Sequence, residues 1–281
     1  MHPQLTQGID VALLVFWAFV LFFIGLVFYL RREDRREGYP LEDAISGRLQ
    51  APGGPLSMAS TKSFLLPFGH GTVTAPTQGR EPVDIAARRT ERSVGAPYAP
   101  TGNPLVDGIG PAAWAERAKR PDLDMEGHPR IVPLDTAPGF HVAQQDSDLT
   151  GWPIIAADGR IAGTVRTLWI DKADRLVRYL DVALSGATAQ PADSTVVPIM
   201  APAAGTEPLV ATGPLLAPMM MARVDRRGHR VVIDAITAAQ FADVPRLSAP
   251  DQITLYEEER VQAYFGGGYL YASADRQEPL L

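Results

Sequence analysis

One uninterrupted apolar run constrains this chain more than any other feature. Residues 11–30 read VALLVFWAFVLFFIGLVFYL, without a single charge. At about 1.5 Å of rise per residue, a helix of this length spans the ~30 Å hydrocarbon core of a bilayer. A signal peptide would have a basic start and a small-residue cleavage site, whereas this chain begins MHPQLTQGID and the run ends in RREDRRE. We therefore predict a retained transmembrane helix over residues 11–31, preceded by a short segment, residues 1–10.

The flanking charges predict the orientation of this helix. Basic residues follow the apolar run directly, at Arg31, Arg32, Arg35 and Arg36. No Lys or Arg precedes it. Because basic flanks remain on the cytoplasmic side, we expect residues 1–10 outside and the remainder of the chain in the cytoplasm.

Composition excludes several classes of function. The chain has no Cys, which rules out disulfides, Cys-based zinc sites and a thiol nucleophile. Its net charge of −6 argues against a nucleic-acid partner. The motifs GxxxxGK[ST], GxGxxG, GxSxG and HExxH are absent. We therefore expect no enzyme of these common classes.

The rest of the chain divides into a Pro/Gly-rich part and a strand-rich part. Residues 32–120 have few periodic runs, so we expect an extended segment that is ordered by lying against a partner. Within it, residues 63–68 and 72–74 are typical of isolated strands. Residues 249–281 predict one C-terminal helix with an acidic start, which we expect the glycines at 266–268 to interrupt.

Residues 121–248 carry the pattern of a small β domain. Strand-like runs separated by turn sequences occur at 152–156, 160–170, 178–184, 195–199, 219–224 and 230–233. Short antiparallel strands at this spacing predict a small closed barrel. The predicted fold class is therefore a single N-terminal transmembrane α-helix, a mainly-β cytoplasmic domain and a C-terminal helix.

Two clusters of ionisable residues are candidates for chemistry. The first alternates along the chain as Asp122, Asp124, Glu126 and His128. In an extended backbone all four side chains would project to one side. Such a row can bind a cation or collect protons, because crowded carboxylates have spread pKa values and His titrates near neutrality. A solvated acidic loop is the alternative.

The second cluster comprises Asp171, Asp174 and Arg178, around the turn of a predicted hairpin (WIDKADRLVRYL). A turn also needs such residues for its geometry and solubility. A neighbouring arginine would lower the pKa of the two carboxyls, while burial under a partner would raise it. Proton relay needs carboxyl pKa values in which these two opposing effects are balanced.

Long, unusual strings give this chain a resemblance to a known family. They include RREDRREGYPLE (31–42), KSFLLPFGHGTVTAP (62–76), DLDMEGHPRIVPL (122–134) and AGTVRTLWIDKADRLVRYLDV (162–182). A further string, FADVPRLSAPDQITLYEEERVQAYFGGGYLYA, covers residues 241–272. The chain resembles the H subunit of the purple-bacterial photosynthetic reaction centre, whose cytoplasmic domain is an antiparallel PRC-type barrel.

The resemblance implies a role within a larger complex. An H subunit binds no cofactor itself; bacteriochlorophyll, bacteriopheophytin, quinones and non-haem iron are expected in the partner subunits L and M. It stabilises the L/M core, shields the quinone sites and helps deliver protons to the secondary quinone. A tetrahaem cytochrome, a light-harvesting antenna and membrane lipids are further expected partners. The expected location is the bacterial inner (intracytoplasmic) membrane, with a periplasmic N-terminus.

The resemblance also implies roles for both clusters. Asp122 and Asp124 match acidic residues where the family takes up protons. His128 matches one of its two histidines there, and Glu126 replaces the other. The family binds inhibitory transition metals at that pair, so at most a weak surface metal site is expected at Asp124, Glu126 and His128.

The resemblance implies roles for the second cluster in the same way. Asp171 and Arg178 match interior pathway residues, and Asp174 stands where the family often has the longer Glu. Two other functions stay open: a membrane-tethered PRC-barrel adaptor unrelated to photosynthesis, and a tethered metal-dependent enzyme that uses residues 122–128.

Overall fold

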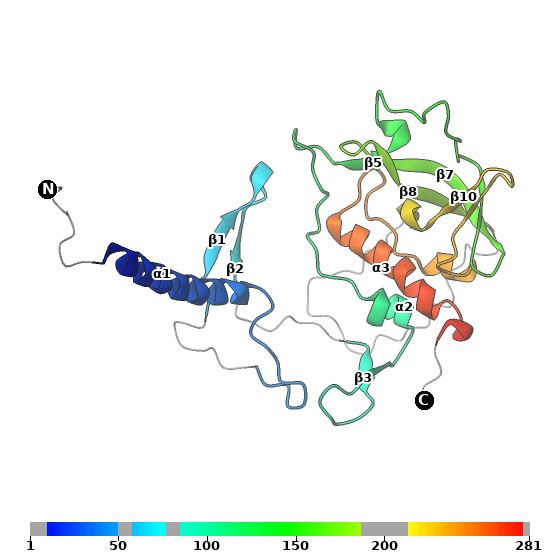
Figure 1. Ribbon diagram of the computed structural model, residues 1–281. Coiled ribbons are helices and arrows are strands. Elements are labelled where there is room, and N and C mark those ends of the chain that lie inside the picture. The colour runs from blue at the N-terminus through cyan, green and yellow to red at the C-terminus, as the bar shows by residue number, and fades with distance from the viewer. Residues whose placement is uncertain (1–9, 50–57, 77–84, 187–212, 278–281) are drawn as a thin grey trace. The chain divides into compact units, whose positions relative to one another are not determined.

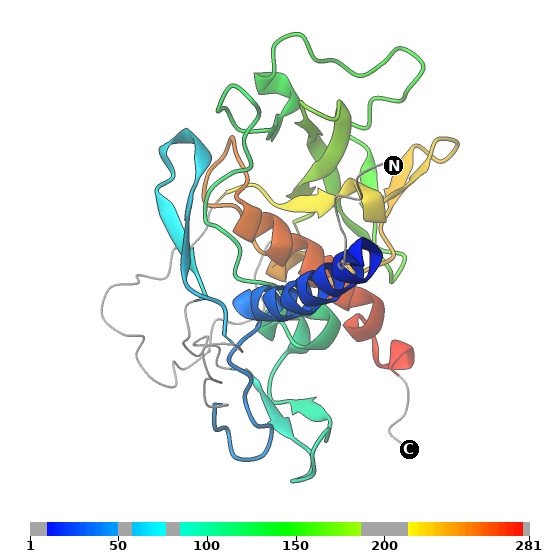
Figure 2. The same ribbon diagram turned by 60° about the vertical axis from the view of Figure 1, so that its left-hand side comes forward.

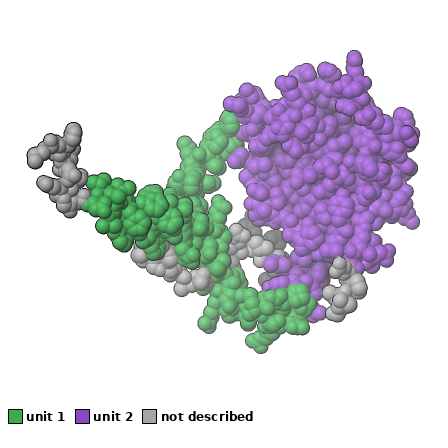
Figure 3. Space-filling view, in the orientation of Figure 1, with its two compact units in different colours: residues 1–84, 89–97 green, residues 85–88, 98–281 purple. Residues whose placement is uncertain are grey.

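A computed structural model describes residues 10–49, 58–76, 85–186 and 213–277 of the chain. Most of the predicted N-terminal segment 1–10, and the predicted strand 195–199, lie outside the described residues. The chain forms two compact units, residues 1–84 with 89–97, and residues 85–88 with 98–281 (Figure 3).

The first unit contains the apolar helix α1, Val11–Glu33. Asp10 caps its start, because the Asp10 carboxylate accepts hydrogen bonds from the amides of Ala12 and Leu13. None of the helix residues is buried. Among the described residues α1 alone is long and apolar enough to cross a membrane, which agrees with the predicted span. A short 3₁₀ turn, Asp34–Arg36, follows it.

A β-hairpin is tied to the end of α1. Strand β1, Lys62–Leu65, pairs antiparallel with β2, Thr72–Ala75 (Figure 1). The sequence predicts isolated strands here, but the backbone amides and carbonyls of β1 and β2 form hydrogen bonds with each other. Arg36 donates to the carbonyl oxygens of Ser60 at 2.8 Å and Ala75 at 2.7 Å. Lys62 forms an ion pair with Glu33 at 2.9 Å. The charged exit of α1 therefore fixes the base of the hairpin.

The second unit is built on one mixed sheet of seven strands. Their bounds are Ile131–Pro133 (β5), Pro153–Ile155 (β6), Ile161–Asp171 (β7), Leu176–Leu184 (β8), Leu216–Pro218 (β9), Arg223–Asp225 (β10) and Arg230–Val232 (β11). The strand order is β10-β11-β6-β7-β8-β9, and β5 also pairs with β7. A separate two-stranded sheet joins β3, Ala87–Arg89, to β4, Tyr98–Pro100.

The mainly-β prediction is confirmed, but two of its details are wrong. Strand β11 pairs with β6 in parallel, so the sheet is not wholly antiparallel. Within the part of the chain that the structure describes, the end strands β9 and β10 do not pair, and the barrel is open. Between them the chain turns through a 3₁₀ turn, Met219–Met221, that replaces the first half of the predicted strand 219–224. Pro218, which lacks an amide hydrogen, ends β9.

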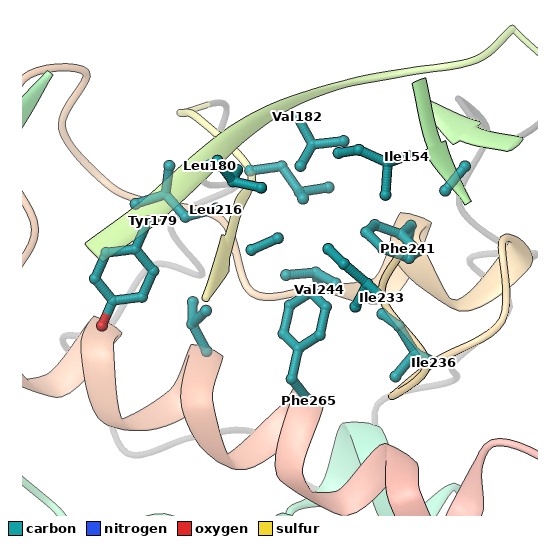
Figure 4. Packing of buried hydrophobic residues seen from close by; sticks show 14 of the residues in the cluster. Ile154, Tyr179, Leu180, Val182, Leu216, Ile233, Ile236, Phe241, Val244 and Phe265 are labelled. Carbon is teal, nitrogen blue, oxygen red and sulfur yellow. The ribbon is translucent and has the colours of Figure 1, made fainter. Parts of the chain in front are cut away.

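Helix α3, Leu255–Tyr271, closes the core below the sheet (Figures 1 and 2). A capping box between Thr254 and Glu257 starts it. Phe265 points from α3 into the core and meets Phe241 edge-on, with ring centroids 5.6 Å apart (Figure 4). Leu180 from β8 lies on the opposite wall and is fully buried.

The three glycines 266–268 do not interrupt this helix, contrary to the prediction. Gly267 packs on Ala112, which belongs to a 3₁₀ turn, Gly110–Ala112, that follows the short helix α2, Pro104–Asp107. A Cβ at Gly268 would overlap the carbonyl oxygen of Ala235. Tertiary packing therefore outweighs the low helix propensity of glycine, because only a residue without a side chain lets these backbones approach so closely.

This packing predicts opposite effects at adjacent glycines. Gly267→Ala and Gly268→Ala should each destabilise the protein by about 1–3 kcal/mol, since the added methyl group collides with backbone. Gly266→Ala is the matched control: the nearest atom to its new Cβ is the Pro111 oxygen at 3.8 Å, so better helix propensity should stabilise by about 0.5–1 kcal/mol. Denaturant titration of the full chain in detergent measures all three. Equal effects at the three positions would contradict the packing described.

Candidate functional site

The end of β7 presents a buried carboxylate. Asp171 is the last residue of β7 and is only 1% exposed. Its Oδ1 accepts hydrogen bonds from the amides of Ala173 at 2.9 Å and Asp174 at 3.0 Å. Asp171 thus shapes the turn that the sequence predicted between β7 and β8, and both of its oxygens also accept hydrogen bonds from side chains.

Arg130 is the centre of the cluster, and the sequence analysis missed it. The residue precedes β5, whose pairing with β7 places Ile131 opposite Asp171. The guanidinium of Arg130 lies 2.9 Å from Asp171, 2.7 Å from Asp174 and 3.4 Å from Asp122. One cation therefore joins both predicted clusters.

Arg178 is the second cation, as predicted. Its guanidinium lies 2.7 Å from Asp174 and 3.3 Å from Asp171. Burial by itself raises the pKa of Asp171, but the hydrogen bonds from Arg130 and from the Asp174 amide outweigh it and hold the pKa below its ordinary value. Asp171 is therefore a fixed negative charge that orients two arginines. Asp174 keeps 45% of its side chain exposed and therefore has access to water.

Residues 122–128 do not form the extended acidic row that the sequence predicted. The amide of Asp124 donates to the His128 carbonyl oxygen at 2.9 Å, and Leu123 bridges to Pro129, so residues 124–128 form a tight turn. The expectation that four side chains project to one side is therefore wrong. Asp124 turns inward instead, where it pairs with Lys172 at 2.8 Å. That hydrogen bond, followed by the one from the His128 amide, lowers the pKa of Asp124.

Glu126 and His128 remain at the surface of the turn. Glu126 is exposed, and the His128 side chain is 71% exposed with its Nδ1 3.8 Å from Asp124. Over the described residues, no three His, Asp or Glu side chains are grouped so that they could hold a metal ion. The weak site predicted at Asp124, Glu126 and His128 does not form in this geometry, because the Asp124 carboxylate is committed to Lys172 and to backbone amides.

A half-buried acid, also missed from the sequence, borders the cluster. Glu258, in the first turn of α3, accepts a hydrogen bond from the Tyr179 hydroxyl at 2.9 Å, and Gln262 donates to that hydroxyl at 2.8 Å. Burial raises the pKa of Glu258, and the negative charges of Asp122 and Asp171 raise it further. Glu258 therefore retains a proton to higher pH than an ordinary Glu. The sequence around Glu258 (YEEER) did not indicate this contact with Tyr179, because the contact depends on α3 docking against β8.

The Asp171 geometry predicts how stability depends on pH. Because the pKa of Asp171 is lowered in the folded state, its stabilising effect is complete above the ordinary Asp range and is lost as pH falls through the lowered folded value. Asp171→Asn should cost about 1.5–3 kcal/mol at neutral pH, the value of hydrogen bonds to a charged group. The cost should shrink in acid. Denaturant titrations from pH 7 downward measure both effects, with the exposed Asp275→Asn as the control. A cost that does not change with pH would contradict the role of the charge.

Comparison with known families accounts for most of the chain. Residues 3–136 match the family described as the photosynthetic reaction centre H-chain N-terminal region. Residues 142–240 match the PRC-barrel domain. The first match contains α1, the hairpin, the acidic turn and Arg130. The second contains the sheet from β6 to β11, with Asp171, Asp174 and Arg178.

These matches confirm the resemblance found in the sequence. The H chain is a subunit of the reaction centre and not a classical enzyme, and its family implies assembly with the L and M subunits and association with a membrane. With an H-chain match over its N-terminal part and a PRC-barrel match over most of the rest, the chain belongs to the H-subunit family of the photosynthetic reaction centre.

Proposed function

We propose that this chain stabilises the L/M core, shields the quinone sites and helps deliver protons to the secondary quinone during light-driven electron transfer. The observation that carries the proton-delivery role is the Arg130 guanidinium, which joins Asp122, Asp171 and Asp174 in one network. Carboxylates that share a cation lie close enough to pass a proton through one another or through a water molecule.

The proposed route runs from exposed to buried groups. His128 and Glu126 lie at the surface, where they meet protons from water. Asp122 and Asp174 are half-exposed and contact Arg130 from two sides. With its lowered pKa, Asp171 stays charged at neutral pH and keeps the arginines in place, so Asp174 is the carboxylate that carries the proton.

Replacement of the family's second histidine by Glu126 bears on proton uptake. An unperturbed Glu titrates near pH 4.3 and an unperturbed His near 6.5, so a carboxylate is a less ready donor at neutral pH. His128 is then the one imidazole of the family's pair that this turn retains. Losing one imidazole also weakens any transition-metal binding at this turn, in agreement with the inward position of Asp124.

The remaining assignments belong to the same proposal. Residues 11–31 span the bacterial inner membrane, with residues 1–10 periplasmic and the rest cytoplasmic. Residues 32–120 lie on partner surfaces, residues 121–248 form the PRC-barrel domain, and residues 249–281 form the C-terminal helix and tail. Exposed apolar side chains of the hairpin, such as Leu65 at 83% exposed and Phe68 at 52%, support a partner for the extended segment. Pigments, quinones and iron reside in the partner subunits, and a cytochrome, an antenna and lipids complete the assembly.

The H-chain match favours this function over a tethered PRC-barrel adaptor. An adaptor needs the barrel and the anchor, but it has no need for the sequence between them to follow the H chain. That intervening sequence matches the family through residue 136.

Asp174→Asn should slow the second, proton-coupled electron transfer to the secondary quinone. The amide keeps hydrogen-bonding capacity but cannot carry a proton, so the step should slow by about 10²-fold or more, the usual size of a lost acid–base group. Flash-induced absorbance changes of the assembled complex measure the rate. The first electron transfer in the same sample, and the exposed Asp275→Asn, serve as controls. An unchanged second-transfer rate would exclude Asp174 from the route.

A further inference from the structure

The PRC-barrel domain contains a cavity apart from the charged cluster. Its volume is about 450 Å³, within the range of small-ligand pockets. The walls are mostly apolar side chains from β7, β8, β10 and the loop between β5 and β6. They include Leu134, Val142, Leu168, Ile170, Val177 and Val224.

The open barrel explains why this space exists. Leu168 and Ile170 alternate to the same face of β7, and Val177 pairs with Ile170 from β8. On the far side, Met219 and Val224 lie on the 3₁₀ turn and on β10, the part of the sheet that does not return to β9. The loop between β5 and β6 extends beyond the sheet (green, Figure 2), and its side chains line one side of the cavity. Several wall residues, Leu134, Val142, Val177 and Val224 among them, are therefore only partly buried.

The mouth of the cavity carries an excess of positive charge. Arg175, from the β7–β8 turn, and Arg226, from the β10–β11 turn, both line it. Arg226 pairs with Asp146 of the covering loop at 3.3 Å, while Arg175 has no acidic partner among the described residues. His141 also lines the cavity. Two arginines against one carboxylate favour an anionic group at the entrance.

We propose that this cavity binds one long-chain fatty acid, with its alkyl chain between β7, β8 and β10 and its carboxylate at Arg175 and Arg226. The apolar walls match a methylene chain, because each CH₂ group that leaves water for an apolar surrounding stabilises the bound state. The volume suits one chain, not the two chains of a phospholipid. The unpaired Arg175 selects a carboxylate over a neutral lipid.

The binding is tested with a photoreactive palmitic acid that carries a diazirine near its methyl end. The full chain is reconstituted in phosphatidylcholine nanodiscs, irradiated with a trace of the probe, digested and analysed by mass spectrometry. Labelled peptides should contain residues 168–177 or 219–224. The methyl ester of the same probe, which lacks the charge, should label these peptides several-fold less.

Variants at the mouth provide the decisive comparison. Arg175→Ala and Arg226→Ala should each reduce labelling of the cavity peptides about two- to fivefold, the scale of partly exposed ion pairs. Arg227→Ala, in the same turn as Arg226 but not lining the cavity, should leave labelling unchanged. Labelling confined to α1, or equal for acid, ester and all variants, would show partition into the bilayer only and overturn the proposal.

Discussion

The contacts of Arg130 with three carboxylates are the interaction on which the rest of this site depends. Asp171 is withdrawn from water, and a buried carboxylate is costly unless a cation and hydrogen bonds compensate it. Arg130, the residue before β5, supplies that compensation although it is distant in sequence, and in doing so it fixes the end of β7 to β5. The β7–β8 turn can then hold Asp174 beside Arg178. The packing of β5 on β7, the geometry of the β7–β8 turn and the charge balance of the site therefore all depend on the contacts of Arg130.

This arrangement separates two tasks that carboxylates perform. Asp171, held ionised, acts as the structural charge, whereas the half-exposed Asp174 and Asp122 contact Arg130 and keep access to water. Glu258, whose pKa burial raises, borders the same group from α3. Groups with pKa values pushed in opposite directions, side by side, are the usual arrangement where protons move.

Local pattern predicted much of this protein, and long-range contacts account for what it missed. The charge-free run, the hairpin around Asp171 and the capped C-terminal helix all follow from neighbouring residues. The open barrel does not, because pairing of β11 with β6 and the turn after Pro218 depend on strands far apart in sequence. Arg130 lies 41 residues from Asp171, so sequence spacing could not reveal their ion pair. Alternation suggested an extended acidic row, but Asp124 bonds to its own turn amides instead.

The central claim is that this chain works as part of a pigment-bearing, quinone-reducing complex. An affinity tag on the chain, gentle solubilisation of the membranes and an absorption spectrum of the purified material test it most directly. The account predicts near-infrared bacteriochlorophyll bands that travel with the chain at a fixed ratio and bleach reversibly in light. A folded, monodisperse chain that purifies without pigment from photosynthetic membranes would contradict it.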